Sequence, residues 1–472
     1  MRTPGRQETY EPCPLKRRRE DPETPICDFV RAYAASGSKR LHMPGHKGIP
    51  DGFLNCEPYD ITEVDGADAL YEADGIIAES ERIAAELFGS GRTLYSTEGS
   101  SQCIRAMVHL AVTCRRQGAR PVFLAARNAH RAFLYACALA DADVVWLSPS
   151  SGISSVISCP VSSAQVEKAL SAPDAAFCGV YITSPDYLGQ MQDIAALAEI
   201  CHRHGTPLLV DNAHGAYLHF LPEADFGKLH PLDLGADLCC DSAHKTLPVL
   251  TGGAYLHLSK DAAGVFAPGA KAAMALHGST SPSYLTLCSL DSCNAYLAGS
   301  IIYELNRFRL LPALSDARRM LRSAGFSVIE GDPLHLSLLC DGISAGQVLR
   351  KAGIEPEYAG PDALILLFSP QDTQGTVTHV TKYLTALPAQ TKKAAFFEAA
   401  PEKTQKVLRI REAVFAPQET VPAASAAGRI AAFPTAACPP AVPPVMPGER
   451  ITPEAVRILT YYGYTSVSVV KE

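Results

Sequence analysis

Charged residues are scarce in this sequence, and neither sign strongly predominates. They make up 19% of the 472 residues, against about 25% in an average globular protein, and 42 basic and 49 acidic residues leave a net charge of −7. This balance provides no broad basic face for nucleic acid. The one basic run, at 16–19, lies between acidic residues and is interpreted as a solvated segment.

Long apolar runs and paired cysteines are also missing. No stretch of about 20 uncharged apolar residues occurs, and residues 1–20 lack the apolar core of a signal peptide. The 15 cysteines are scattered and form neither a CxxC pair nor a paired metal-ligand spacing, so no metal site is predicted. We therefore expect a folded cytoplasmic protein with reduced thiols and no membrane segment.

Short apolar runs alternate with helical stretches between residues 75 and 260. This alternation predicts an α/β fold with a mostly parallel sheet that helices cover on both faces. Ligands of such sheets bind beyond the carboxyl ends of the strands. The predicted strands are 122–125, 144–147, 179–183, 207–210, 238–240 and 254–256, and helices such as 76–88 and 195–204 lie between several of them.

The rest of the chain divides into smaller units. An irregular arm precedes a helix at 26–35, and mixed helices and strands after residue 300 predict a second, smaller α+β domain. Eight prolines between 417 and 447 indicate an extended segment that leads into a last helix at 453–462. The expected units are an arm (1–50), a large domain (51–300), a small α+β domain (301–395) and a C-terminal domain (396–472).

Asp211 and Lys245 each follow an apolar run of the predicted sheet. A lysine in this place can form a Schiff base with an aldehyde cofactor. Pyridoxal phosphate (PLP) needs such a lysine, together with a carboxylate that keeps its pyridine nitrogen protonated. The pair therefore indicates a PLP site at the carboxyl ends of the strands.

A phosphate cradle is predicted at 97–102 (TEGSSQ), ahead of a helical pattern that begins at Ile104. Gly99 lets the backbone approach an anion, and the first helical N–H groups and the serine hydroxyls can point at it. Ser242 and His244 are placed to add donors from a neighbouring strand end. Alone, a Gly-Ser-Ser sequence before a helix more often indicates an N-cap.

Together, these features resemble the motifs of the ornithine/lysine/arginine decarboxylase family, in order from about residue 26 to 455. The matching motifs are LHMPGHKG (41–48), EGSS (98–101), RNAH (127–130), DNAHG (211–215), SAHKTL (242–247), TSPSY (280–284) and MPGE (446–449). The resemblance implies the aspartate-aminotransferase fold (fold type I) with PLP as cofactor. It also implies decarboxylation of lysine, arginine or ornithine to cadaverine, agmatine or putrescine, reactions of polyamine biosynthesis.

The resemblance further implies roles for single residues. Lys245 carries the PLP, Asp211 pairs with its ring nitrogen, and His130 stacks on the ring. Lys245 or His244 returns a proton to Cα. The remaining implied contacts are Ala213 and His214 near the cofactor, Gly99, Ser100, Ser101, Ser242 and His244 at the phosphate, and Thr280 and Ser281 at the phosphate of a neighbouring subunit. The expected assembly is a homodimer or a higher homo-oligomer with active sites at the subunit interface.

A basic substrate needs an acidic group at the far end of its pocket. Glu449, Asp65 and Asp68 are candidates, although each could equally be a solvated carboxylate. His46 is a further candidate at the substrate, and it could instead hold a turn together with His42. The sequence does not choose among ornithine, lysine and arginine.

Several positions depart from the family pattern. Asn212 stands where the family usually has Glu, and Asp186 stands where Thr is common. Cys438 and Ala441 replace two residues of a Tyr-Pro-Pro-Gly pattern. These changes leave the cofactor residues intact and bear on substrate preference. The short chain also argues against an N-terminal wing domain and the large decamers of longer relatives.

Two alternatives remain open. An aminotransferase or a β-eliminating lyase would use the same fold and cofactor, although no motif offers the arginine with which aminotransferases hold the α-carboxylate. A non-catalytic relative is the other alternative, and the presence of both Lys245 and Asp211 argues against it.

Overall fold

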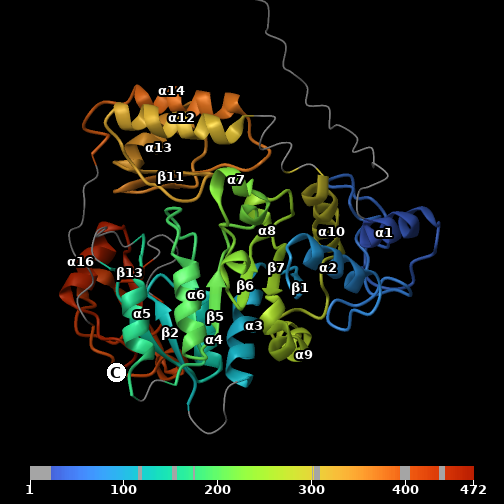
Figure 1. Ribbon diagram of the computed structural model, residues 1–472, viewed down its shortest axis with the longest axis horizontal. Helices are drawn as coiled ribbons and strands as arrows, with labels where there is room; N and C mark the ends of the chain where they lie inside the picture. The colour runs from blue at the N-terminus through green and yellow to red at the C-terminus, as the bar shows by residue number, and fades with distance from the viewer. Residues whose placement is uncertain are drawn as a thin grey trace, which may run out of the picture.

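The structure is a computed structural model that describes residues 23–114, 120–150, 157–173, 176–299, 301, 309–393, 404–434 and 442–472. A seven-stranded sheet forms its centre (Figure 1). Its strands, in spatial order, are β1 (Arg92–Ser96), β7 (Ala254–Leu258), β6 (Leu238–Asp241), β5 (Leu208–Asp211), β4 (Gly179–Thr183), β2 (Val122–Ala126) and β3 (Asp143–Leu147).

The central sheet is parallel except at β7, which runs antiparallel to both of its neighbours. Parallel strands need long crossovers, and the helices of these crossovers cover the two faces. One face packs against α3 (Ser100–Thr113), α4 (Arg131–Leu139) and α9 (Lys260–Leu276). The other face packs against α5 (Ser163–Leu170) and α6 (Ile194–Arg203). The predicted mostly parallel α/β sheet is confirmed.

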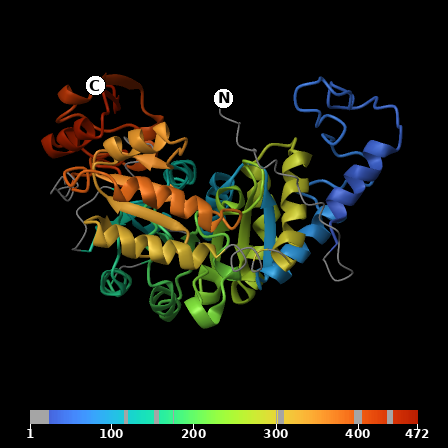
Figure 2. The same cartoon turned by 90° about the horizontal axis from the view of Figure 1, so that it is seen from above.

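Three helices pack together beside the β1 edge of the sheet (Figure 1). They are α1 (Pro25–Ala35), α2 (Ile76–Leu87) and α10 (Tyr284–Gly299). The connection from α1 to α2 projects from the body of the molecule (blue, Figure 2). Its residues include several large apolar side chains that are exposed to solvent.

A second, four-stranded antiparallel sheet lies above the central one in Figure 1. Its strands, in spatial order, are β10 (Tyr358–Ala359), β11 (Ala363–Leu367), β9 (His335–Leu339) and β8 (Ser327–Val328), and its helices are α12 (Leu310–Ser323), α13 (Gly342–Lys351) and α14 (Gln374–Thr385). This is the small α+β arrangement expected after residue 300.

The C-terminal part has a small core of its own, beside α5 (red, Figure 1). Its elements are α15 (Ile410–Phe415), β12 (Gln418–Pro422), α16 (Pro453–Tyr461) and β13 (Ser466–Val470), and β12 pairs with β13. The proline-rich segment thus begins as an edge strand, where proline is tolerated because an edge strand leaves N–H groups unpaired.

Three details differ from the predicted elements or extend them. The helix expected from Ile104 begins at Ser100, directly after Gly99. Strand β1 was not predicted, and residues 302–308, part of the segment after residue 300 in which mixed helices and strands were expected, lie outside the described residues. Within the described ranges, no helix is both long enough and apolar enough to cross a membrane, and the cysteines there are free thiols.

Candidate active site

A cavity of about 510 Å³ opens at the carboxyl ends of β4, β5 and β6. Ten of the predicted site residues line it, and they come from four separate segments of the chain. They are Gly99, Ser100, Ser101, His130, Asp211, Ala213, His214, Ser242, His244 and Lys245. The parallel strands bring these segments together because their carboxyl ends meet at one edge of the sheet.

Asp211, the last residue of β5, places a buried carboxylate at the cavity. The Tyr181 hydroxyl donates a hydrogen bond to Oδ2 at 2.9 Å, and the backbone N–H of Ala213 donates to Oδ1 at 3.2 Å. Tyr181 lies on the neighbouring strand β4 and is fully buried. These donors fix the direction of the carboxylate.

Lys245 lies in α8 (Ala243–Thr246), the short helix that follows β6. Its Nζ is 3.1 Å from Nε2 of His214. Burial, followed by the positive charge of Lys245, holds the pKa of His214 well below its usual range. The neutral imidazole can therefore accept a hydrogen bond from the lysine amine at Nε2.

The predicted anion cradle lies at the start of α3. Gly99 has φ +74°, a conformation that glycine adopts without strain, and its N–H donates to the Gly252 carbonyl at 2.7 Å. The first N–H groups of a helix have no partner within the helix and can point at an anion. The Ser242 hydroxyl donates to the Ser100 hydroxyl at 2.8 Å, so donors from two segments meet at this point.

Two further histidines border the cavity. His244 Nδ1 lies 2.9 Å from the Gly253 carbonyl, which can only accept, so Nδ1 carries the hydrogen. His130 caps α4, and its Nδ1 accepts from the Ala132 N–H at 3.2 Å. The pKa of both imidazoles is lowered, mainly by burial and further by the charge of Lys245, while Asp211 opposes the shift at His130.

His335, at the start of β9, approaches the site from the small sheet. Its ring centre is 5.4 Å from that of His214, and its Nδ1 is 3.2 Å from Oδ1 of Asp332. The Tyr217 hydroxyl also donates to Asp332. Among the described residues, Nδ1 of His214 has no hydrogen-bond partner. Sequence reasoning missed His335 because nothing near it in the chain resembles a site.

Two of the predicted substrate residues are engaged elsewhere. Glu449 forms a buried, two-pronged ion pair with Arg127, with N–O distances of 3.0 and 2.7 Å. Burial alone would raise the pKa of this carboxyl, but Arg127 lowers it. Asp68 accepts the backbone N–H groups of Gly75 and Ile77 at the start of α2, at 3.0 and 2.9 Å. Neither carboxylate lines the cavity.

The other residues that do not line the cavity come from two loops. His46 pairs with Asp60 at 3.1 Å within the α1–α2 connection. Thr280 and Ser281 are exposed between α9 and α10, as residues that reach a second subunit would be, and this role stays a prediction. An acidic group that was not predicted, Glu357, lines the cavity from the small sheet side and accepts from the Tyr187 hydroxyl at 3.0 Å.

Two of the residues that depart from the family pattern, Asn212 and Asp186, form specific hydrogen bonds. Asn212 is buried and donates from Nδ2 to Asp241 Oδ1 at 2.8 Å, so it does not face solvent. Asp186 is buried beneath Tyr187 and accepts from Ser158 and from two backbone N–H groups. Cys438 and Ala441 lie outside the described residues.

The cavity combines a lysine, a buried carboxylate and a predicted anion cradle. It lies on a seven-stranded sheet in which one strand is antiparallel to the other six. These features define a PLP-dependent enzyme of fold type I. The residues fit the cofactor. Lys245 offers the amine, Asp211 the partner for a protonated ring nitrogen, and the start of α3 the donors for a phosphate.

Comparison with known proteins identifies the family. The sequence profile of the Orn/Lys/Arg decarboxylase major domain matches residues 24–323, and that of the C-terminal domain matches residues 389–468. The chain therefore belongs to the Orn/Lys/Arg decarboxylase family. It is a PLP-dependent amino-acid decarboxylase.

Similar proteins extend over almost the whole chain. YaaO of Bacillus subtilis (strain 168), an uncharacterized protein, is 30% identical over 468 residues, which cover 93% of this chain and 94% of that protein. An arginine decarboxylase of the same organism is 28% identical and covers 92% of each chain. The structure of lysine decarboxylase A from Pseudomonas aeruginosa has a TM-score of 0.73 at 20% identity, over 95% of this chain and 80% of that one, which shows a shared fold.

Proposed function

We propose that this enzyme decarboxylates an amino acid whose side chain ends in a cation, namely arginine, lysine or ornithine. The observation that carries the proposal is the position of Glu357 in the wall of the cavity that also holds Lys245 and Asp211. A carboxylate there can pair with an ammonium or guanidinium group. The decarboxylases of arginine and lysine among the similar proteins support the same substrate class.

Each group of cavity residues would contact a different part of the cofactor. PLP bound there supplies an electron sink for the bond that breaks at Cα. Asp211, held by Tyr181, would keep a proton on the ring nitrogen. The start of α3 would hold the phosphate, and His130 would cover one face of the ring.

Proton return to Cα would come from Lys245 or His244. The neutral His214 accepts a hydrogen bond from the lysine amine and keeps it directed into the cavity. His244 has Nε2 available, because its Nδ1 hydrogen is held by the Gly253 carbonyl. A general acid must lie within hydrogen-bond reach of the carbon it protonates.

Glu357 is proposed as the partner of the distal cation, in place of Glu449 and Asp68. Glu357 is exposed at the cavity mouth and is held by the hydroxyl of Tyr187, which also lines the cavity. Its second oxygen can accept from the substrate. This pairing would select basic side chains over neutral ones of the same length.

The test is CO₂ release by the PLP-loaded protein from arginine, lysine and ornithine, with norleucine as a neutral comparison. We expect Glu357→Gln to raise KM at least tenfold for the preferred basic substrate, because a charged contact is lost. Glu355→Gln is the matched control, since Glu355 pairs with Arg350 and does not line the cavity. An unchanged KM in Glu357→Gln would refute the role of Glu357, and release from none of the three basic amino acids would refute the proposed reaction.

A further inference from the structure

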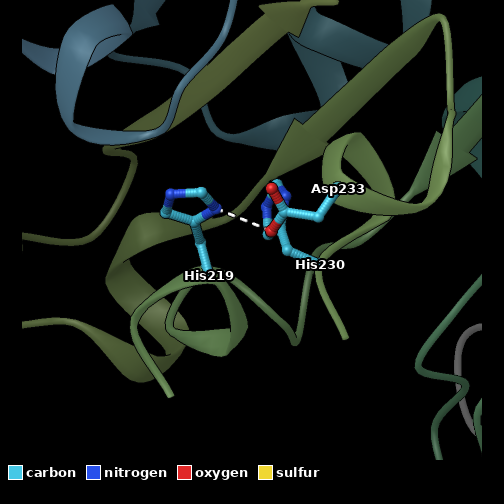
Figure 3. A group of neighbouring side chains, drawn as sticks. All are labelled: His219, His230 and Asp233. Atoms are coloured by element: carbon cyan, nitrogen blue, oxygen red, sulfur yellow. Dashed lines mark hydrogen bonds and ion pairs between the residues drawn. The ribbon is translucent and has the colours of Figure 1, made fainter. Parts of the chain in front are cut away.

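A group of polar side chains lies in the connection from β5 to β6, and none of them lines the cavity. His219 belongs to the 3-10 helix η1 (Leu218–Phe220), and Asp233 belongs to the 3-10 helix η2 (Pro231–Leu234), which His230 caps. One ligand atom from each of these three residues lies within 4.8 Å of the others. Figure 3 shows His219 and Asp233 facing each other, with His230 beside the carboxylate.

We propose that His219, His230 and Asp233 form a binding site for a divalent transition metal ion, most suitably Zn²⁺. Two imidazoles and one carboxylate are a common set of protein ligands for zinc, with bonds of about 2.0–2.2 Å. The Nδ1 atom of His219 is already 2.7 Å from Oδ2 of Asp233, so small side-chain rotations bring these atoms around an ion.

A second group of residues orients His230. Its Nε2 is 3.0 Å from Oδ2 of the fully buried Asp241. An ionised carboxylate can only accept, so His230 carries its hydrogen on Nε2 and keeps a lone pair on Nδ1.

The Nδ1 lone pair of His230 is weakly used. It accepts the Leu232 N–H at 3.4 Å, the long end of the hydrogen-bond range. Because Leu232 precedes Asp233, this nitrogen points toward the turn that carries the Asp233 carboxylate. A carboxylate behind a ligating imidazole fixes the tautomer and increases the basicity of the ligand.

Access distinguishes this site from the group behind it. The side chains of His219 and Asp233 are 21% and 25% exposed, so an ion can enter from solvent and keep a water ligand. His230, Asp241 and His257 also lie within metal-ligand range of one another, but they are fully buried. We therefore assign Asp241 and His257 a role in orienting His230 and not in binding the metal.

An ion at this site would stabilise the crossover between the two strands that carry the active-site residues. Residues 212–237 connect Asp211 to the strand that precedes Ser242, and they form only η1, η2 and the four-residue α7 (Glu223–Phe226). A metal with ligands from η1 and η2 would cross-link two parts of this connection. The expected role is structural, with a higher thermal midpoint in the bound state.

The test is metal binding by the PLP-loaded protein, without a polyhistidine tag, after removal of metal with a chelator. We expect one equivalent of Zn²⁺ per chain at saturation, a rise in thermal midpoint with Zn²⁺, and visible absorbance when Co²⁺ replaces it. His219→Ala and Asp233→Asn should each weaken Zn²⁺ binding at least tenfold and abolish the Co²⁺ absorbance.

His202→Ala is the matched control. His202 forms a similar partly exposed pair with Asp237 at 3.1 Å, but this pair belongs to no three-ligand group among the described residues. Zn²⁺ affinity should be unchanged in this variant. Wild-type protein that binds no Zn²⁺, or binding that is equal in wild type and His219→Ala, would overturn the proposal.

Discussion

His214 lies between the active-site lysine and a histidine of the small sheet. Lys245 contacts its Nε2, and the His335 ring packs 5.4 Å away, centre to centre. A charged imidazole would be repelled by Lys245 and costly to bury, so the neutral form is stable here. The small sheet thereby packs against the histidine that contacts Lys245.

The raised pKa of Asp186 should make the free energy of unfolding depend on pH, and a neutral residue at this position should remove that dependence. Burial raises the pKa of Asp186 from 3.8 to about 6, although Ser158 and two backbone N–H groups oppose the shift. Between about pH 4 and 6 the folded protein holds a proton that the unfolded chain has released. Stability therefore falls as pH rises through this window, by up to about 3 kcal/mol, and stays lower above it.

Asp186→Asn should lack this loss, because asparagine has no proton to release and its oxygen can still accept the backbone N–H groups. The measurement is urea unfolding of both proteins between pH 4 and 8. The variant should gain stability relative to wild type as pH rises to about 6, with no further gain above it. A difference that is the same at every pH would contradict the raised pKa.

The sequence predicted the residues at the strand ends but not those that approach from the small sheet. Lys245 and Asp211 follow apolar runs, and parallel strands bring such residues together whatever the loop details. Glu357 and His335 reach the site only through the packing of one sheet on another, which leaves no local pattern. Glu449 and Asp68 were predicted as carboxylates that bind the substrate cation. Their partners, Arg127 and the start of α2, became visible only in the structure.

At the scale of elements, the junction between β1 and α3 is the predicted phosphate-binding site. Gly99→Ala would force a side chain into φ +74°, at a cost of about 1–2 kcal/mol, although the nearest atom to the new Cβ is 3.9 Å away. The backbone should relax and move the first N–H groups of α3. We expect the dissociation constant for PLP to rise about tenfold.

The matched control is Gly205→Ala. Gly205 also has positive φ, +61°, with no atom within 4 Å of an added Cβ, and it does not line the cavity. Titration of both variants with PLP should show weaker binding only in Gly99→Ala, while both lose some thermal stability. Equal PLP affinity in the two variants would mean that the start of α3 does not hold the phosphate.

The Arg127–Glu449 pair joins the end of β2 to the C-terminal part. Glu449→Gln would leave a buried guanidinium without its counter-charge, which typically costs about 3–5 kcal/mol. The thermal midpoint should therefore fall clearly, while the preference among basic substrates stays the same. Glu419→Gln is the control, because the pair of Glu419 with Arg429 lies at the surface and should contribute at most about 1 kcal/mol. A change of substrate preference in Glu449→Gln would restore its role at the substrate.

Most strands of the central sheet could be predicted, because each is a short apolar run between polar segments. Six strands of the central sheet were predicted from their apolar runs, and the boundaries agree within about two residues. β1 has the mixed sequence RTLYS and was missed, because its burial comes from pairing with β7 and not from an apolar pattern. The start of α3 was placed too late because its first three residues, Ser100, Ser101 and Gln102, are polar and precede the apolar residues of the helix.

At the scale of the whole molecule, the exposed apolar side chains of the α1–α2 connection support the predicted homodimer. Leu41 and Phe53 are 95% and 83% exposed, and Met43, Ile49 and Leu54 also face solvent. Apolar groups gathered in this way commonly mark a protein interface. Light scattering during size-exclusion chromatography should give twice the mass of the 50.4 kDa chain.

The double variant Leu41→Ser, Phe53→Ser should shift this dimer toward monomer. Leu250→Ser is the control, because Leu250 is a single exposed apolar residue, 54% exposed, outside the α1–α2 connection. A wild-type monomer at micromolar concentration, or a dimer unaffected by the double variant, would contradict the predicted interface.

Release of CO₂ is the most direct measure of the proposed decarboxylation. The purified protein, loaded with PLP, is supplied separately with arginine, lysine and ornithine, and the product amines are identified by mass. We predict CO₂ and the matching amine from at least one of the three, and none from the Lys245→Ala variant. No release from any of them by a protein that has bound PLP, or equal release by Lys245→Ala, would contradict the account.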